Sequence, residues 1–198
     1  MAAPSHASTS ADPGALAPDE NVRLMRGETI VRSETITRSE RRYVGGVAYT
    51  VVDATGAELD AMLVDPQTYL QVLPRTKSAR IVGRDAGDVL VELRQGTWLM
   101  EGTYTIVVRR SGPEIRFWLD PRRPHDIEDA WGFFRIEPLA QVAPRTPRSL
   151  LTYGVLVDLG PGVVRDLFEE KIRGLALAVP ARVRDYVDRS VRGHRPRA

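Results

Sequence analysis

Hydrophobic residues alternate with polar ones through the middle of the chain, and they recur every three or four positions near its end. Alternation places successive side chains on opposite faces of a β-strand, whereas the longer period places them on one face of a helix. Alternating segments with turn-forming residues between them are typical of an antiparallel meander. The predicted strands are Tyr43–Val52, Ser78–Arg84, Val89–Gln95, Trp98–Arg109, Ile115–Leu119, Ala130–Ile136 and Ser149–Leu159.

Two short helices are predicted between the first two of these strands. Asp53 or Thr55 can accept hydrogen bonds from the free N–H groups at the start of the first helix. Asp65 and Pro66 suit the cap and the first position of the second helix, and Pro74 prevents that helix from continuing. Gly45-Gly46, within the preceding strand, predicts a bend or a bulge.

One long amphipathic helix is predicted from about Gly162 to Val191. At 1.5 Å per residue it would be roughly 45 Å long, enough to cross a sheet. Pro180 interrupts the hydrogen-bond ladder to Ala176 and predicts a kink. Gly174, Ala176 and Ala178 carry little side-chain bulk, which predicts a gap between this part of the helix and the sheet. The apolar face comprises Val164, Phe168, Ile172, Leu175, Val179, Val183, Tyr186 and Val187.

Charged side chains predict which side of each strand faces water. The outward set is Glu92, Arg94, Arg109, Arg116, Arg135 and Asp158. Strand neighbours point to the opposite face. The inward set is therefore Ala79, Ile81, Val91, Leu93, Tyr104, Ile106, Val108, Phe117, Leu119, Phe134, Ile136, Tyr153, Val155 and Val157. Apolar and aromatic side chains with a few hydroxyls are typical of a pocket lining, and equally of an ordinary core.

Composition limits the classes of function. A chain of 198 residues with 42% hydrophobic residues supports one well-buried domain. The net charge of +2 arises from 28 basic and 26 acidic residues spread over the whole chain, so no nucleic-acid partner is predicted. The absence of cysteine excludes disulfides, thiol catalysis and thiolate-bound metals.

Four regions are expected along the chain: a disordered leader (1–22), an extended arm or extra edge strand (23–40), a ligand-binding domain (41–192) and a basic tail (193–198). The leader lacks the pattern of a signal peptide, and no apolar run reaches the roughly 20 residues that span a bilayer. We therefore expect a cytoplasmic location, or export if an upstream signal has been removed. Transient contact of the tail with an anionic membrane surface is an alternative to a solvated end. The oligomeric state stays open.

The order of these elements resembles the helix-grip fold of the START-like (SRPBCC) superfamily, and is most similar to its polyketide-cyclase and coenzyme-Q-binding branch. Tyr49–Val82 carries the resemblance through Asp65, Tyr69 and Leu73-Pro74, together with Asp129–Leu139 and the closing helix. The resemblance implies an α+β fold in which a curved antiparallel sheet of about seven strands wraps around a long C-terminal helix. It also implies a cavity for a lipid, an isoprenoid, a quinone or a polyketide-like molecule.

Three functions are compatible with this pattern. The first is binding or transport of a hydrophobic small molecule, with no cofactor, metal or catalytic residue. The second is a polyketide cyclase or aromatase, which needs a tyrosine, an arginine or His125 in the cavity. The third is a protein-interaction module with a filled core that docks through Trp118 and Trp131. The residues predicted to bind ligand are Tyr49, Leu93, Tyr104, Ile106, Phe117, Phe134, Tyr153, Val155, Ile172, Leu175 and Val179.

The densest group of titratable residues comprises His125, Asp126, Glu128 and Asp129. A histidine beside carboxylates can exchange protons or join a metal site. Pro121 and Pro124 instead favour a solvated loop, and no metal site is predicted there.

Overall fold

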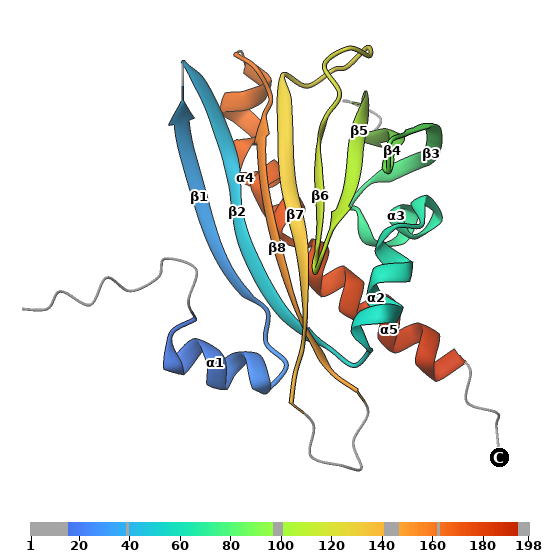
Figure 1. Cartoon of the computed structure of the whole chain (residues 1–198). Coiled ribbons are helices and arrows are strands. Elements are labelled where there is room, and N and C mark those ends of the chain that lie inside the picture. Colours follow the sequence, from blue (N-terminus) through green and yellow to red (C-terminus); the bar gives the residue numbers. More distant parts are fainter. Residues whose placement is uncertain (1–15, 39, 97–100, 141–146, 162, 194–198) are drawn as a thin grey trace, which may run out of the picture.

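The computed structural model describes residues 16–38, 40–96, 101–140, 147–161 and 163–193 (Figure 1). Eight strands form one antiparallel sheet in the order β1-β2-β8-β7-β6-β5-β4-β3. The strands are β1 (Ile30–Arg38), β2 (Arg41–Val52), β3 (Thr76–Asp85), β4 (Asp88–Gly96), β5 (Glu101–Ser111), β6 (Glu114–Leu119), β7 (Asp129–Pro138) and β8 (Ser149–Asp158). All consecutive strands from β3 to β8 pair with their neighbour in sequence, as an antiparallel meander requires.

Helices lie on both faces of the sheet, and most of them lie on one face. α4 (Val163–Leu177) and α5 (Val179–Gly193) lie along one face, called here the inner face, and α2 (Gly56–Leu63) and α3 (Pro66–Val72) connect β2 to β3. α1 (Pro18–Met25) lies near the start of β1 and the end of β2 and packs on the outer face (Figure 1). The predicted α+β class, with an antiparallel sheet around C-terminal helices, is confirmed. The sheet has eight strands because β1 joins it as an edge strand.

The predicted caps of the two short helices are present. Thr55 caps α2 through its side-chain oxygen, which accepts from the N–H of Glu58 at 3.2 Å. The Glu58 carboxylate in turn accepts from the Thr55 N–H at 2.7 Å, so the two residues form a reciprocal capping box. Asp65 caps α3, and Pro66 occupies its first turn.

The long C-terminal helix differs from its prediction, because it is two helices separated at Ala178. Proline has no N–H to donate, so Pro180 cannot bond the carbonyl of Ala176. The Ala178 N–H bonds the carbonyl of Leu175 at 3.3 Å, which tightens the last turn of α4. The Arg182 N–H then bonds the carbonyl of Ala178 at 3.2 Å and begins α5. The kink expected at Pro180 is therefore a full helix boundary.

Helix α1 begins within the predicted disordered leader (1–22) and ends within the predicted arm (23–40). Its start is fixed by the Glu20 carboxylate, which accepts from the Ala17 N–H at 2.8 Å and pairs with Arg32 of β1. Leu24 is 3% exposed and packs with Ile30 and Tyr49 on the outer face. Residues 1–15 of the leader and 194–198 of the basic tail lie outside the described residues.

No bulge interrupts β2 at Gly45-Gly46, because its register with both β1 and β8 is continuous. A Cβ atom at Gly45 would lie 1.9 Å from the carbonyl oxygen of Val155, and one at Gly46 would lie 2.0 Å from that of Arg32. Because these two residues have no side chain, β8 and β1 can approach β2 closely. Close approach of strands, and not a bulge, therefore explains the two glycines.

The core fills one end of the inner face. α2, α3 and α5 contribute Leu59, Leu63, Val72, Val179 and Val183 to it, and all five are buried. Two residues differ from their prediction in exposure. Ile81 pairs with Val91 and so lies on the predicted inner face, but it is 40% exposed because β3 is at the edge of the sheet. Asp158 is 4% exposed, because its carboxylate turns back to accept from the N–H of Gly160 at 2.9 Å.

Candidate functional site

A cavity of about 300 Å³ lies on the inner face, beside the packed core. Residues of β4 to β8, α3, the segment after α3 and α4 line it, together with Val179 of α5. Every residue that the sequence predicted to bind ligand lines it, except Tyr49. These residues are Leu93, Tyr104, Ile106, Phe117, Phe134, Tyr153, Val155, Ile172, Leu175 and Val179.

Tyr49 lies on the outer face, so its expected place at the cavity is corrected. It packs with Leu24, Ile30 and Val51, and the Arg32 guanidinium lies 5.6 Å from the centre of its ring. The face on which Tyr49 lies agrees with that of other residues in β2. Val51, two positions away, belongs to the same outer cluster, whereas Val52 belongs to the inner core. The sequence did not distinguish these faces, because residues on both faces of β2 are apolar.

Three aromatic rings cluster at the centre of the lining. The ring centres are 4.7 Å apart for Phe134 and Tyr153, 5.9 Å for Phe117 and Phe134, and 6.0 Å for Phe117 and Tyr153. Gly132 makes room for them, since a Cβ atom there would lie 2.4 Å from the Phe117 ring. The cluster gives the cavity a flat apolar surface, which suits planar or aliphatic groups.

Three tyrosines contribute hydroxyl groups to this otherwise apolar surface. Tyr69 donates to the carbonyl of Leu63 at 2.8 Å, and Tyr104 donates to the side-chain oxygen of Gln95. The hydroxyl of Tyr153 has no hydrogen-bond partner among the described residues. Burial raises the pKa of all three phenols above the ordinary value, so each stays protonated at neutral pH.

Among the described lining residues, the charged ones are Arg75, Glu101 and Asp126, and they lie at one end of the cavity, called here the mouth. This is the end where β6 joins β7 and β8 joins α4, at the top of Figure 1. Glu101 pairs with Lys77 and Arg94. Asp126 accepts from the backbone N–H of Thr103 at 2.7 Å. The carboxylates therefore hold the mouth together.

Sequence reasoning did not assign Arg75, Glu101 or Gln95 to the cavity. It considered Asp126 only within the histidine cluster, and Tyr69 only as part of the resemblance. The shared signal of the mouth residues is position: Arg75 precedes β3, Glu101 begins β5, and Asp126 lies between β6 and β7. Antiparallel neighbours bring such positions to one edge of a sheet. The positions of these residues at strand ends could be predicted from the sequence. Their place at the cavity could not, because it depends on which end of the sheet the helices leave uncovered.

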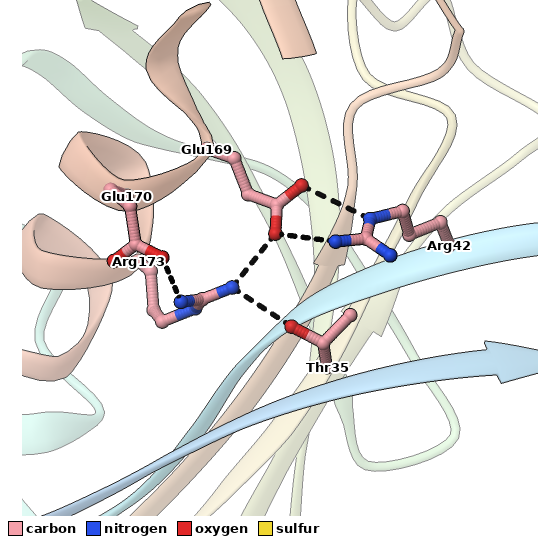
Figure 2. A network of polar contacts seen from close by, with 5 residues as sticks. All are labelled: Thr35, Arg42, Glu169, Glu170 and Arg173. Atoms are coloured by element: carbon pink, nitrogen blue, oxygen red, sulfur yellow. Dashed lines mark hydrogen bonds and ion pairs between the residues drawn. The ribbon is translucent and has the colours of Figure 1, made fainter. Parts of the chain in front are cut away.

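Glu169 of α4 joins the helix to the sheet through a network of charged side chains (Figure 2). Its carboxylate accepts two hydrogen bonds from Arg42 of β2, at 3.0 and 3.1 Å, and one from Arg173 at 2.8 Å. Arg173 also donates to Thr35 of β1 at 2.8 Å and pairs with Glu170. The wall of the cavity that α4 supplies is thus fixed to β2 by an ion pair and to β1 by a hydrogen bond.

The histidine cluster does not reach the cavity as a unit. His125 is exposed, and its Nδ1 lies 2.7 Å from the carbonyl oxygen of Ile127. Asp129 accepts from the Tyr43 hydroxyl at 2.8 Å on another face. Within the described residues, no group of three or more histidine, aspartate or glutamate side chains is arranged to hold a metal.

The predicted docking face is partly open. Trp131 is 45% exposed, whereas Trp118 is half-buried and has the Arg109 guanidinium 5.1 Å from its ring centre. Trp98 lies outside the described residues. In the described part of the chain, no helix is both long and apolar enough to cross a membrane.

Comparison with solved structures places this arrangement among known folds. A STAR-related lipid transfer protein from Xanthomonas axonopodis superposes with a TM-score of 0.61, at 14% identity, over 81% of this chain and 93% of that one. A START superfamily protein from Mycobacterium smegmatis gives 0.51, at 21% identity, over 71% and 97%. The two-domain aromatase/cyclase StfQ of the steffimycin biosynthetic pathway gives 0.54, at 10% identity, over 87% of this chain and 55% of that one.

No family model matches the sequence, and no curated protein matches it. The structural likenesses show the fold, which is the START-like helix-grip fold that the sequence resembles.

Proposed function

We propose that the protein binds a hydrophobic small molecule, of the lipid, isoprenoid, quinone or polyketide class, in the cavity between the inner sheet face and α4, and carries it. The observation that supports this proposal is a mainly apolar hollow of about 300 Å³ beside the packed core of the same face. Protein interiors are normally close-packed, so a hollow of this size loses contacts that a ligand would restore.

The driving force would be the removal of apolar surface from water, worth about 25 cal/mol per Å². The lining suits this, because its charged groups stand at the mouth and its interior is aliphatic and aromatic. The ligand would enter past the charged residues at the mouth. Its apolar part would lie against the rings of Phe117, Phe134 and Tyr153.

The volume also limits the ligand. A water molecule takes about 30 Å³ in the liquid, so the cavity holds about ten units the size of a water or methylene group. An acyl or prenyl segment of that length, or a few fused rings, would fit. A lipid with two long chains would need the cavity to expand.

The protein-interaction alternative needs a filled core, and the hollow argues against it. The likeness to a lipid transfer protein supports the binding proposal at the level of fold.

The test begins with protein purified without denaturation and analysed by native mass spectrometry and by solvent extraction. We expect an apolar compound to co-purify, or a member of a panel of fatty acids, prenols, quinones and aromatic ketones to raise the melting temperature. A ligand present at 100 times its dissociation constant would stabilise the fold by about 2.7 kcal/mol.

A cavity-filling substitution provides the matched comparison. Ala176→Phe would place a ring in the hollow and should abolish the shift, while Ala57→Phe, on the exposed side of α2, should preserve it. If nothing co-purifies and no compound in the panel shifts the melting temperature of the wild type, the binding proposal is wrong.

A polyketide cyclase or aromatase is the second candidate. It is favoured by the two buried phenols, Tyr104 and Tyr153, that face the cavity, and by the likeness to StfQ. Such an enzyme would fold a flexible poly-ketone chain and supply protons from these hydroxyls. Incubation with a linear poly-ketone thioester, followed by chromatography and mass spectrometry, tests this. A product distribution identical with and without the protein would exclude the cyclase.

A further inference from the structure

Tyr153 of β8 is unlike the other phenols of the cavity. Its side chain is 4% exposed, and the surface that remains faces the hollow. The hydroxyls of Tyr69 and Tyr104 are already committed to Leu63 and Gln95, but that of Tyr153 has no partner among the described residues. The Tyr153 hydroxyl is not among the described side-chain atoms that are fully buried without a partner, so it is accessible from the hollow, where a ligand atom can approach it.

The hydroxyl is available as a hydrogen-bond donor toward a ligand in this setting. Burial in the apolar lining raises the pKa of Tyr153, and the neighbouring Tyr104 adds to the effect, so the group keeps its proton. It can therefore donate to an oxygen atom, but it cannot serve as a base.

The partner must also be uncharged. Phe117 and Phe134 surround Tyr153, and the charged lining residues stand at the mouth. A carboxylate or phosphate placed beside these rings would be desolvated without a counter-charge, which is strongly unfavourable. A ketone, ester or quinone oxygen carries no such penalty.

We infer that Tyr153 is a specificity-determining residue that donates a hydrogen bond to a neutral carbonyl oxygen on an otherwise apolar ligand. This inference rests on the proposed function, because it presupposes that the cavity is occupied. The Tyr153 and Phe117 rings lie 21° from parallel, so the carbonyl group is best carried by a flat or conjugated part of the ligand.

The test uses two probes of nearly equal shape, 2-acetylnaphthalene and 2-ethylnaphthalene, which differ in one carbonyl oxygen. Dissociation constants are measured by calorimetry for the wild type, Tyr153→Phe and Tyr186→Phe. Tyr186 packs against the core from α5 and does not line the cavity, so it is the matched control.

The wild type should bind the ketone about three to ten times more tightly than the hydrocarbon, as expected for one net hydrogen bond. Tyr153→Phe should lose this preference and bind the hydrocarbon at least as well. Tyr186→Phe should keep it. Melting temperatures of the three proteins confirm that each is folded.

The outcomes separate the two proposals. Equal binding of both probes by the wild type, or a preference that survives in Tyr153→Phe, overturns the role of Tyr153 and leaves the cavity as a binding site. If neither probe binds the wild type and the broader panel also fails, the proposed function is lost, and the inference falls with it.

Discussion

The two C-terminal helices cover the same sheet face by different means. α5 is held by apolar packing, with Val183 and Val187 in the main core. α4 turns Ile172 and Leu175 toward a hollow and is fastened by the network around Glu169 instead (Figure 2). The break at Ala178 separates a filled half of the molecule from an open half.

This difference indicates where stability and function are located. Burial at the α5 end secures the fold, while the α4 end gives up packing contacts and retains room for a ligand. Regions with fewer buried contacts open at lower free energy, so α4 should exchange its amide hydrogens faster than α5.

The largest effect should come from Val183→Ala. Val183 is 0% exposed within the filled half, so the substitution removes contacts that cannot be replaced and should lower the free energy of unfolding by about 2 to 3 kcal/mol. Leu175→Ala removes more atoms but borders the hollow, and should cost only about 1 kcal/mol. Urea denaturation measures both. A larger loss for Leu175→Ala would contradict the contrast between the two halves.

A smaller effect is expected when the fastening of α4 is weakened. Glu169→Gln keeps the shape of the side chain but removes the charge that Arg42 and Arg173 share, and should cost about 1 to 2 kcal/mol. Hydrogen exchange should accelerate in α4 and remain unchanged in α5.

The matched control is Glu170→Gln. Its side chain is 83% exposed, and solvent screens its pair with Arg173, so the free energy of unfolding should change by less than about 0.5 kcal/mol. Equal exchange rates for α4 in the two variants would show that the network does not hold the helix.

The smallest effect is a loss of stability at low pH, in the half of the molecule that contains the cavity. Hydrogen bonds from Arg122 lower the pKa of Asp120, which opens the loop that leads to Asp126 at the mouth. The Asp120 carboxylate stabilises the fold fully above about pH 4, the ordinary pKa of an aspartate. This stabilisation is lost as the pH falls through the lowered pKa. Arg122 is 80% exposed, so this contribution should not exceed about 1 kcal/mol.

Asp120→Asn tests this contribution. The melting temperatures of wild type and variant should differ most between pH 5 and 7 and converge below about pH 4. A difference that stays constant over this range would show that the charge of Asp120 does not matter.

Much of the fold was predictable because local rules agreed with the tertiary arrangement. The alternation that predicted the strands, and the caps at Thr55 and Asp65, are properties of neighbouring residues. The same alternation brought Leu93, Phe117, Phe134 and Tyr153 to one surface. It failed for Tyr49, where both faces of β2 are apolar, and it did not predict the exposure of Ile81, which lies on the edge strand β3.

The sequence by itself determined the order of the elements and the inner face of most strands, because backbone geometry converts residue spacing directly into side-chain direction. It also determined that the last helix would be disturbed near Pro180. Only the tertiary structure decided that α1 buries Tyr49 on the outer face, that Gln95 takes the hydroxyl of Tyr104 while that of Tyr153 stays free of a described partner, and that a hollow remains beneath α4. These features depend on contacts between residues distant in sequence, and their distances are set only when the whole sheet and its helices pack together.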